Sequence, residues 1–287
     1  MIWAYGIVNG TKCSLTDTDY FNDGTPNIRM TFDEKVDRCE NAVFEVSFKE
    51  SEWAQELFWM HCVADELRGR VPMILKMPYI PNARMDRRLP CRAFTLKTFA
   101  DIINSMGFDE VVVFDPHSDV APALIDRCRV EMPDFRPLTD LVKDPVMVFP
   151  DAGAMHRYRN YVPEGIPLTF GEKVRDIETN YVVGYELFKG EELRGKDIVI
   201  ADDIISHGYT MVFLLEALMK FEPRSVMIYA SHIEDSCGWG RLYEELKNNE
   251  AYKGIRLFST DSIIRGDWVE DHVPLENSSD KILELIL

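Results

Sequence analysis

The residues of this 287-residue chain that are best suited to chemistry lie in one short stretch, residues 197–210. An apolar run ends there in two adjacent carboxylates, Asp202 and Asp203, and leads through a small polar loop into an apolar run of helical length. This order predicts a strand, a loop and a helix. The backbone N–H groups of such a loop and of the following helix N-terminus bind anions, and the carboxylates can accept hydrogen bonds from sugar hydroxyls. The stretch therefore predicts a ribose-phosphate site.

Three further segments carry polar residues at the ends of predicted strands, namely residues 82–88, 115–117 and 150–153. Taken singly, each is a weak signal. An aspartate at a strand end is often only a helix N-cap, and a lone histidine is more often structural than a ligand. Their joint appearance with the carboxylate pair favours a functional site.

The charge distribution narrows the class of ligand. The chain has 32 basic and 49 acidic residues, a net charge of −17, which argues against a nonspecific nucleic-acid binder. Six cations nevertheless lie close together in sequence: Lys76, Arg84, Arg87, Arg88, Arg92 and Lys97. In an acidic chain this cluster indicates an anionic small molecule, and the alternative is a solvated helix face.

Other compositional features exclude several classes. No apolar stretch approaches the ~20 residues that span a bilayer, and no basic region precedes the apolar residues at the N-terminus, so we expect a cytoplasmic protein without a membrane partner. The six cysteines are scattered without a CxxC pair, which signals neither a zinc site nor a disulfide framework. Buried reduced thiols are the expectation.

The apolar patterning predicts an α/β fold. Strands are expected at residues 71–77, 110–115, 146–149, 198–201 and 225–230, and helices at 54–68, 94–106 and 211–221. Strand–helix alternation with apolar strands implies mostly parallel sheets flanked by helices. In such sheets, ligands bind beyond the carboxyl ends of the strands.

A proline-rich segment predicts the domain boundary. Pro133, Pro137 and Pro145 lie between two halves of similar size. We therefore expect an N-terminal domain over 1–137 and a C-terminal domain over 138–278. A C-terminal helix over 279–287 is a candidate to complete the first domain.

Six motifs occur in the order that is typical of the ribose-phosphate diphosphokinases, the PRPP synthetases. They are FNDGT at 21–25, NARMDRR at 82–88, DPH at 115–117, PDAGA at 150–154, KVR at 173–175 and DDIISHGYT at 202–210. The chain resembles this family in register over residues 21–264, which is nearly its whole length. The resemblance implies two phosphoribosyltransferase-type (Rossmann-like) domains and a homo-oligomer, a dimer or a hexamer, that shares ATP sites between subunits.

The resemblance also implies a role for individual residues. ATP would be bound by Phe21, Asp23, Thr25, Arg84, Met85, Asp86 and His117. The ribose phosphate would be bound by Asp202, Asp203, Ser206, His207, Gly208, Tyr209 and Thr210. His117 and Asp151 would hold Mg²⁺, while Lys173 and Arg175 on a catalytic loop would clamp the transferring group.

The implied reaction fits these residue types. A sugar C1 hydroxyl attacks the β-phosphorus of ATP in line, and AMP leaves. Catalysis of such a transfer is mainly positioning together with neutralisation of charge on the phosphoryl oxygens. Cations such as Lys173 and Arg175 supply that charge; the alternative is a solvated pair on a surface loop.

Departures from the family pattern fall at substrate-facing positions. Thr25 replaces the usual glutamate, Met85 replaces a polar residue, and His207 and Tyr209 stand where small residues usually close on a terminal phosphate. An aromatic ring and an imidazole there can stack on a larger acceptor. The acceptor is therefore either ribose 5-phosphate or ADP-ribose, the substrate of relatives that serve NAD-rebuilding pathways.

Two functions from other classes remain open. A phosphoribosyltransferase shares the fold and the Asp202 loop, but it does not need the ATP segment together with Lys173 and His117. A non-catalytic regulatory homologue is the second. The joint retention of four residues argues against it, namely His117, Asp151, Lys173 and Arg175.

Overall fold

The computed structural model describes residues 2–31, 39–46, 48, 53–175, 182–263, 271–274 and 282–287. The chain forms two compact units, Met1–Glu131 and Met132–Leu287. The boundary falls after Glu131 rather than after Pro137 as expected. The reason is packing, because Phe135 belongs to a buried aromatic cluster of the second unit.

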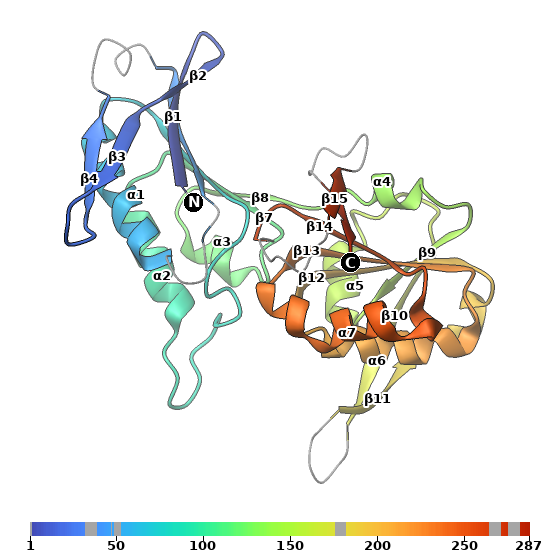
Figure 1. Cartoon of the computed structure of the whole chain (residues 1–287). Coiled ribbons are helices and arrows are strands. Elements are labelled where there is room, and N and C mark those ends of the chain that lie inside the picture. The colour runs from blue at the N-terminus through green and yellow to red at the C-terminus, as the bar shows by residue number, and fades with distance from the viewer. Residues whose placement is uncertain are drawn as a thin grey trace. The chain divides into compact units, whose positions relative to one another are not determined.

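The first unit is built on a six-stranded sheet in the order β2-β1-β5-β6-β7-β8 (Figure 1). Its elements are β1 (Ile2–Val8), β2 (Thr11–Ser14), β3 (Thr16–Tyr20), β4 (Pro26–Met30), β5 (Asn41–Val46), α1 (Trp53–Leu67), β6 (Met73–Met77), α2 (Thr95–Ser105), β7 (Glu110–Phe114), α3 (Val120–Leu124) and β8 (Cys128–Glu131). Strands β5 to β8 are parallel, whereas β1 is antiparallel to both of its neighbours.

One face of this sheet is packed against helices. Alternate residues of the central strands, such as Phe44, Leu75 and Val113, are fully buried in one cluster with the apolar faces of α1 and α2. Every second side chain along a strand therefore points to the core, as expected for a sheet that is covered by a layer of helices.

A separate two-stranded sheet, β3 and β4, forms a hairpin beside α1. The indole Nε1 of Trp59 on α1 donates a hydrogen bond to Thr18 Oγ1 of β3, at 3.0 Å. Ile28 and Met30 of β4 pack against the core cluster of the unit. These contacts fix the hairpin on the helix.

The second unit is built on an eight-stranded sheet in the order β11-β10-β9-β12-β13-β14-β16-β15. Its helices and strands are α4 (Arg136–Thr139), β9 (Pro145–Phe149), α5 (Ala152–Tyr158), β10 (Leu168–Arg175), β11 (Val182–Leu187), β12 (Asp197–Ile205), α6 (Tyr209–Leu218), β13 (Ser225–Ile233), α7 (Arg241–Asn248), β14 (Arg256–Thr260), β15 (Asp271–Pro274) and β16 (Ile282–Ile286). Short 3₁₀ turns lie at Gly190–Leu193, Met219–Phe221, Asp235–Trp239 and Glu250–Tyr252. The central strands β10, β9, β12, β13 and β14 are parallel.

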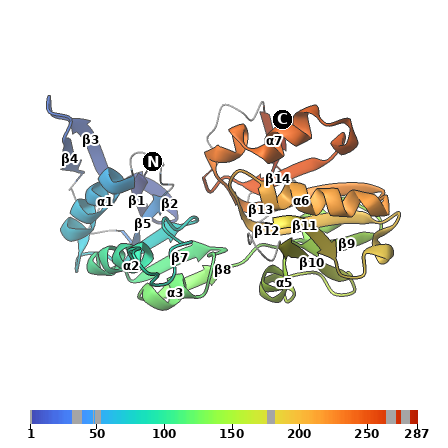
Figure 2. The same cartoon turned by 90° about the horizontal axis from the view of Figure 1, so that it is seen from below.

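Both faces of this sheet are covered. Ile198 and Ile200 of β12 face a cluster formed with α6 and α7, whereas Val199 and Ala201 face the aromatic cluster with Phe135. Figures 1 and 2 show α6 and α7 together on one side of β12 and β13. Burial on both faces explains why these strands are continuous apolar runs. The predicted α/β class with mostly parallel, helix-flanked sheets is confirmed.

The C-terminal prediction is wrong. Residues Ile282–Ile286 form strand β16, which pairs antiparallel with β14 and belongs to the second unit; residues 279–281 of the expected helix lie outside the described part of the chain. A short apolar run has no periodicity that separates a helix from a strand. The ion pair of Arg256 with Glu284, at 2.6 Å, and the burial of Ile282 and Leu285 stabilise the strand.

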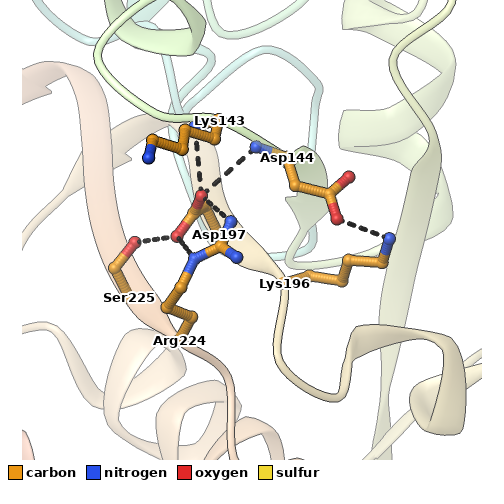
Figure 3. A network of polar contacts seen from close by, with 6 residues as sticks. All are labelled: Lys143, Asp144, Lys196, Asp197, Arg224 and Ser225. Carbon is orange, nitrogen blue, oxygen red and sulfur yellow. Dashed lines mark hydrogen bonds and ion pairs between the residues drawn. The ribbon is translucent and has the colours of Figure 1, made fainter.

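A polar network fixes the start of β12 (Figure 3). Asp197 is only 4% exposed, and its carboxylate accepts hydrogen bonds from the Arg224 guanidinium, from Ser225 Oγ and from the backbone N–H groups of Lys143 and Asp144. The Arg224 hydrogen bond is the main cause that holds the pKa of Asp197 well below its usual range. The network lies at the opposite end of β12 from Asp202, so its contribution is structural.

Among the described helices, none combines the length and the apolarity that a membrane crossing requires.

Candidate functional site

In the second unit, two adjacent parallel strands present their predicted functional residues beyond their paired segments. Strand β9 pairs with β12 up to Ile200, and Asp151 lies two residues after the end of β9. Asp202 and Asp203 lie near the carboxyl end of β12. Because parallel strands point the same way, these carboxylates share one edge of the sheet.

Asp151 caps α5. Its backbone is extended, and its Oδ1 accepts a hydrogen bond from Ala154 N at 2.9 Å. Asp151 therefore acts as a helix N-cap, which is the alternative role of an aspartate at a strand end. An N-cap uses one carboxylate oxygen, so capping is compatible with a cation on the second oxygen.

Asp202 and Asp203 form a crowded acidic pair. The Asp203 N–H donates to Asp202 Oδ1 at 3.0 Å, and Asp203 is 7% exposed. Burial raises the pKa of Asp202 well above its usual range, and the charges of Asp203 and Asp151 raise it further. The carboxylate oxygens of Asp202 and Asp203 therefore lie close together, where hydroxyl donors or a cation would stabilise their charge.

A cation from α5 reaches this pair. Arg157 Nη1 lies 3.4 Å from Asp203 Oδ2. Arg157 therefore orients the second carboxylate and offsets part of its charge. The sequence reasoning missed this residue, although a cation on a helix that begins at a strand-end aspartate is a usable signal.

The loop after β12 turns tightly into α6. Gly208 has φ of 77°, a left-handed conformation that favours glycine. A Cβ built on Gly208 would lie 2.2 Å from Leu242 Cβ of α7. The N–H of Leu242 donates to the His207 carbonyl at 3.2 Å. The loop therefore packs against the start of α7, and no local sequence signal indicates this contact.

The side chains of this loop differ in their surroundings. Ser206 Oγ lies 3.2 Å from His207 Nδ1 and 3.0 Å from Ser236 Oγ. Tyr209, the first residue of α6, is 56% exposed, and its ring centroid is 6.3 Å from that of His207. Thr210 follows, half-buried, on the first turn of the helix. An exposed phenol ring at the start of α6 is available to stack on a ligand.

Lys173 and Arg175 lie on strand β10, not on a loop as expected. The strand continues past its pairing with β9 and forms an antiparallel hairpin with β11, in which Lys173 is opposite Tyr185. The Lys173 side chain is exposed. Only the backbone of Arg175 is described, and residues 176–181 lie outside the described part.

In the first unit, two predicted segments share one sheet edge. Arg84, Met85 and Asp86 follow β6, and His117 follows β7, its parallel neighbour. Arg84 is exposed, Met85 and Asp86 are half-buried, and Asp86 Oδ1 accepts from Arg87 Nε at 3.2 Å. His117 is half-buried and comes two residues after a fully buried aspartate with φ of 41°.

Phe21, Asp23 and Thr25 lie on a different element, the tip of the β3–β4 hairpin. Phe21 N donates to the Thr25 carbonyl, and Asp23 Oδ1 accepts from both Thr25 N and Thr25 Oγ1. The hydroxyl of Thr25 is the main cause that lowers the pKa of Asp23. Phe21 is 57% exposed. The tip is therefore an ordered turn that presents an aromatic ring.

The donor set fits a weakly ligated cation rather than a closed metal cage. Within the described ranges, no group of three or more His, Cys, Asp or Glu is placed to hold a metal ion. Mg²⁺ is typically held by one or two carboxylates with substrate phosphates and waters. Burial and the neighbouring carboxylates raise the pKa of Asp202, so positive charge beside this residue would stabilise its ionised form.

Comparison with known proteins places these residues in context. Residues 149–263 match the phosphoribosyl transferase domain family. The ribose-phosphate pyrophosphokinase of Saccharolobus solfataricus is 30% identical over 190 residues, which are 62% of this chain and 64% of that protein. That of Sulfurisphaera tokodaii is 29% identical over 230 residues, 76% of this chain and 74% of that protein. The aligned part thus spans less than two thirds of the first relative's length.

The fold has a solved counterpart. The phosphoribosylpyrophosphate synthetase from Mycobacterium smegmatis aligns over 85% of both chains with a TM-score of 0.63 and 20% identity. The strand-end carboxylates, the phosphoribosyl transferase domain and these relatives agree with the order of motifs along the sequence. The chain is similar to the ribose-phosphate pyrophosphokinases, or PRPP synthetases, and its residues 149–263 match the phosphoribosyl transferase domain family.

Proposed function

We propose that this protein is an ATP-dependent diphosphokinase. It transfers the β,γ-pyrophosphoryl group of ATP to the C1 hydroxyl of a ribose 5-phosphate-type acceptor and releases AMP. The observation that carries the proposal is the Asp202–Asp203 pair, which is followed by a tight loop into α6 within the matched phosphoribosyl transferase domain.

The acceptor half of the site is proposed for the second unit. Asp202 and Asp203 accept hydrogen bonds from the ribose hydroxyls. The N–H groups of residues 206–210 and the N-terminus of α6 bind the 5′-phosphate. Arg157 holds the Asp203 carboxylate in a fixed orientation for this contact.

The ATP half is proposed for the first unit. Phe21 stacks on the adenine, Asp23 accepts from its amino group, and Thr25 fixes that turn. Arg84 contacts the phosphates of ATP. Met85 and Asp86, which follow Arg84 in the same segment, belong to the same proposed ATP site. Lys173 and Arg175 of the second unit then neutralise charge on the transferring group. Positioning and charge neutralisation are the main sources of catalysis in such a transfer.

Mg²⁺ completes the proposal. His117 of the first unit and Asp151 of the second are each proposed as a ligand of the ion, which would supply positive charge to the phosphates of ATP. We further propose a homo-oligomer, a dimer or a hexamer, and a cytoplasmic location, where ATP and phosphorylated sugars are available.

Two acceptors compete. The names of the relatives favour ribose 5-phosphate. The exposed ring of Tyr209 beside His207 favours an acceptor whose 5′-phosphate carries a further group with an aromatic face. ADP-ribose has this composition, since it combines a C1 hydroxyl with an AMP moiety, and its product would serve the rebuilding of NAD.

One experiment tests both levels of the proposal. The purified full chain is incubated with ATP, Mg²⁺ and either sugar, AMP is quantified by chromatography, and the 1-diphosphate is identified by ³¹P NMR. AMP release with ribose 5-phosphate alone would rule out ADP-ribose. If neither sugar leads to AMP release, the proposed diphosphokinase activity is wrong. If the protein instead consumes PRPP together with a nucleobase, it is a phosphoribosyltransferase.

A further inference from the structure

The thiol groups of two cysteines lie beside one glycine in the first unit. Cys13 lies on β2, Cys39 lies two residues before β5, and β1 runs between these strands. Cys13 is paired in register with Gly6 of β1. A Cβ built on Gly6 would lie 2.3 Å from Cys39 Sγ and 3.3 Å from Cys13 Sγ. Both sulfurs therefore occupy the space that a side chain at residue 6 would fill.

The surroundings of the two sulfurs keep them together. Cys13 Sγ donates to the Gly6 carbonyl at 3.4 Å, and Leu15 Cδ2 lies 3.2 Å from the same Cβ position. Both cysteines are half-buried thiols in the structure. Burial raises the pKa of Cys39, and the adjacent Cys13 raises it further. The scattered sequence positions gave no indication of this pair.

We propose that Cys13 and Cys39 are a redox site that closes to an intramolecular disulfide. The thiolate of one cysteine attacks a low-molecular-weight disulfide such as oxidised glutathione, which forms a mixed disulfide and releases one glutathione thiolate. The thiolate of the second cysteine attacks the mixed disulfide and releases the second glutathione. The two cysteines are oxidised, one glutathione disulfide is reduced to two thiols, and the protein's two thiol protons pass to solvent or to the departing thiolates.

The position of the pair gives the bond a structural consequence. The disulfide would enclose residues 14–38, which include the β3–β4 hairpin and the turn at 21–25. A cross-link around such a segment restricts the unfolded chain and raises the melting temperature. The bond does not depend on the proposed reaction, because it requires only the two thiols beside Gly6.

The test uses the full chain in buffers of defined glutathione redox ratio. After oxidation, remaining thiols are alkylated and the protein is digested without reduction. We expect one cross-linked peptide pair containing Cys13 and Cys39, two hydrogens lighter than the sum of the reduced peptides. We also expect a melting temperature raised by about 5 °C or more, reversed by dithiothreitol. The rate should increase with pH, because a raised thiol pKa leaves little thiolate at neutral pH.

Matched variants separate this site from general thiol oxidation. Cys13→Ser and Cys39→Ser should each abolish the cross-link and the shift, whereas Cys62→Ser, at another half-buried thiol, should retain both. Gly6→Ala should suppress the cross-link by displacing Cys39 Sγ; the serine variants remain informative if this variant does not fold. Full alkylation of Cys13 and Cys39 after oxidation, glutathione adducts alone, or a link to any other cysteine overturns the proposal.

Discussion

The Arg157 guanidinium lies 3.4 Å from the Asp203 carboxylate, which joins α5 to the carboxyl end of β12. Asp203 is 7% exposed and adjoins Asp202, whose pKa is raised by burial and by neighbouring carboxylates. A nearly buried carboxylate needs a partner to remain charged and oriented. Arg157 therefore positions one of the two proposed ribose-binding groups without itself being required to touch the acceptor.

Arg157→Gln should weaken acceptor binding. Loss of the guanidinium removes the ion pair that helps to orient Asp203, so we expect the KM for the acceptor to rise about tenfold, a cost of about 1.4 kcal/mol, with a smaller change in the KM for ATP. Steady-state kinetics with each substrate varied in turn measures this split.

Two variants control this prediction. Arg157→Lys retains a cation and should restore most of the acceptor affinity. Arg159→Gln changes an exposed arginine at the end of the same helix and should leave both KM values unchanged. A tenfold effect on ATP alone would contradict the positioning role.

Lys173→Ala should reduce kcat by about 100-fold or more, because a cation that stabilises charge developing on the transferring group is worth about 3 kcal/mol. Lys173 is exposed on the β10–β11 hairpin, so the melting temperature should not change. Lys220→Ala, at an exposed lysine of the same unit, is the control. Unchanged turnover would refute the proposed clamp.

The central strands and the carboxylate site were predictable because their signals are local. Asp202 and Asp203 end an apolar run, and burial on both faces of the sheet makes such runs continuous. The sequence predicts a loop at Lys173 and Arg175, whereas these residues lie on β10. The strand extends there past its pairing with β9, and it is held by pairing with β11, a later segment of the chain.

Other features depend on contacts that the sequence does not encode locally. Ile282–Ile286 is a strand because β14 offers an edge, whereas the same apolar run would suit a helix. The ion pair of Arg157 and the packing of Leu242 on Gly208 join elements far apart in sequence. The roles of the ATP-side residues stay predictions.

Gly208→Ala should open the phosphate loop. At φ of 77° any side chain is strained, and a Cβ would lie 2.2 Å from Leu242 Cβ. Gly254→Ala is the matched control, since its φ of 87° imposes the strain but nothing lies within 4 Å of the added Cβ. We expect Gly254→Ala to cost about 1 kcal/mol and Gly208→Ala about 2 kcal/mol more, measured by urea unfolding. Equal costs would contradict the close contact with α7.

Asp197→Asn should make the stability of the second unit less sensitive to acid. The Arg224 hydrogen bond holds the pKa of Asp197 below the unfolded value of about 3.9. Its contribution is therefore complete above that value and is lost as the pH falls toward the folded pKa. We expect the variant to lose about 2 kcal/mol at pH 7 and the difference from wild type to shrink below pH 4, as measured by urea unfolding. Asp144→Asn, at an exposed partner of Lys196, should cost less than about 1 kcal/mol.

Tyr209→Ala distinguishes the two acceptors. If the exposed ring stacks on the AMP moiety of ADP-ribose, its removal should raise the KM for ADP-ribose about tenfold or more, since stacking on a base is worth about 1–3 kcal/mol. Ribose 5-phosphate has no such moiety, so its KM should change less than twofold. Tyr209→Phe retains the ring and should bind ADP-ribose nearly as the wild type does, and Tyr161→Ala controls for loss of an exposed tyrosine elsewhere in the unit. Equal losses with both sugars would instead assign Tyr209 to the shape of the phosphate loop, because only an acceptor that extends past the 5′-phosphate can reach the exposed ring.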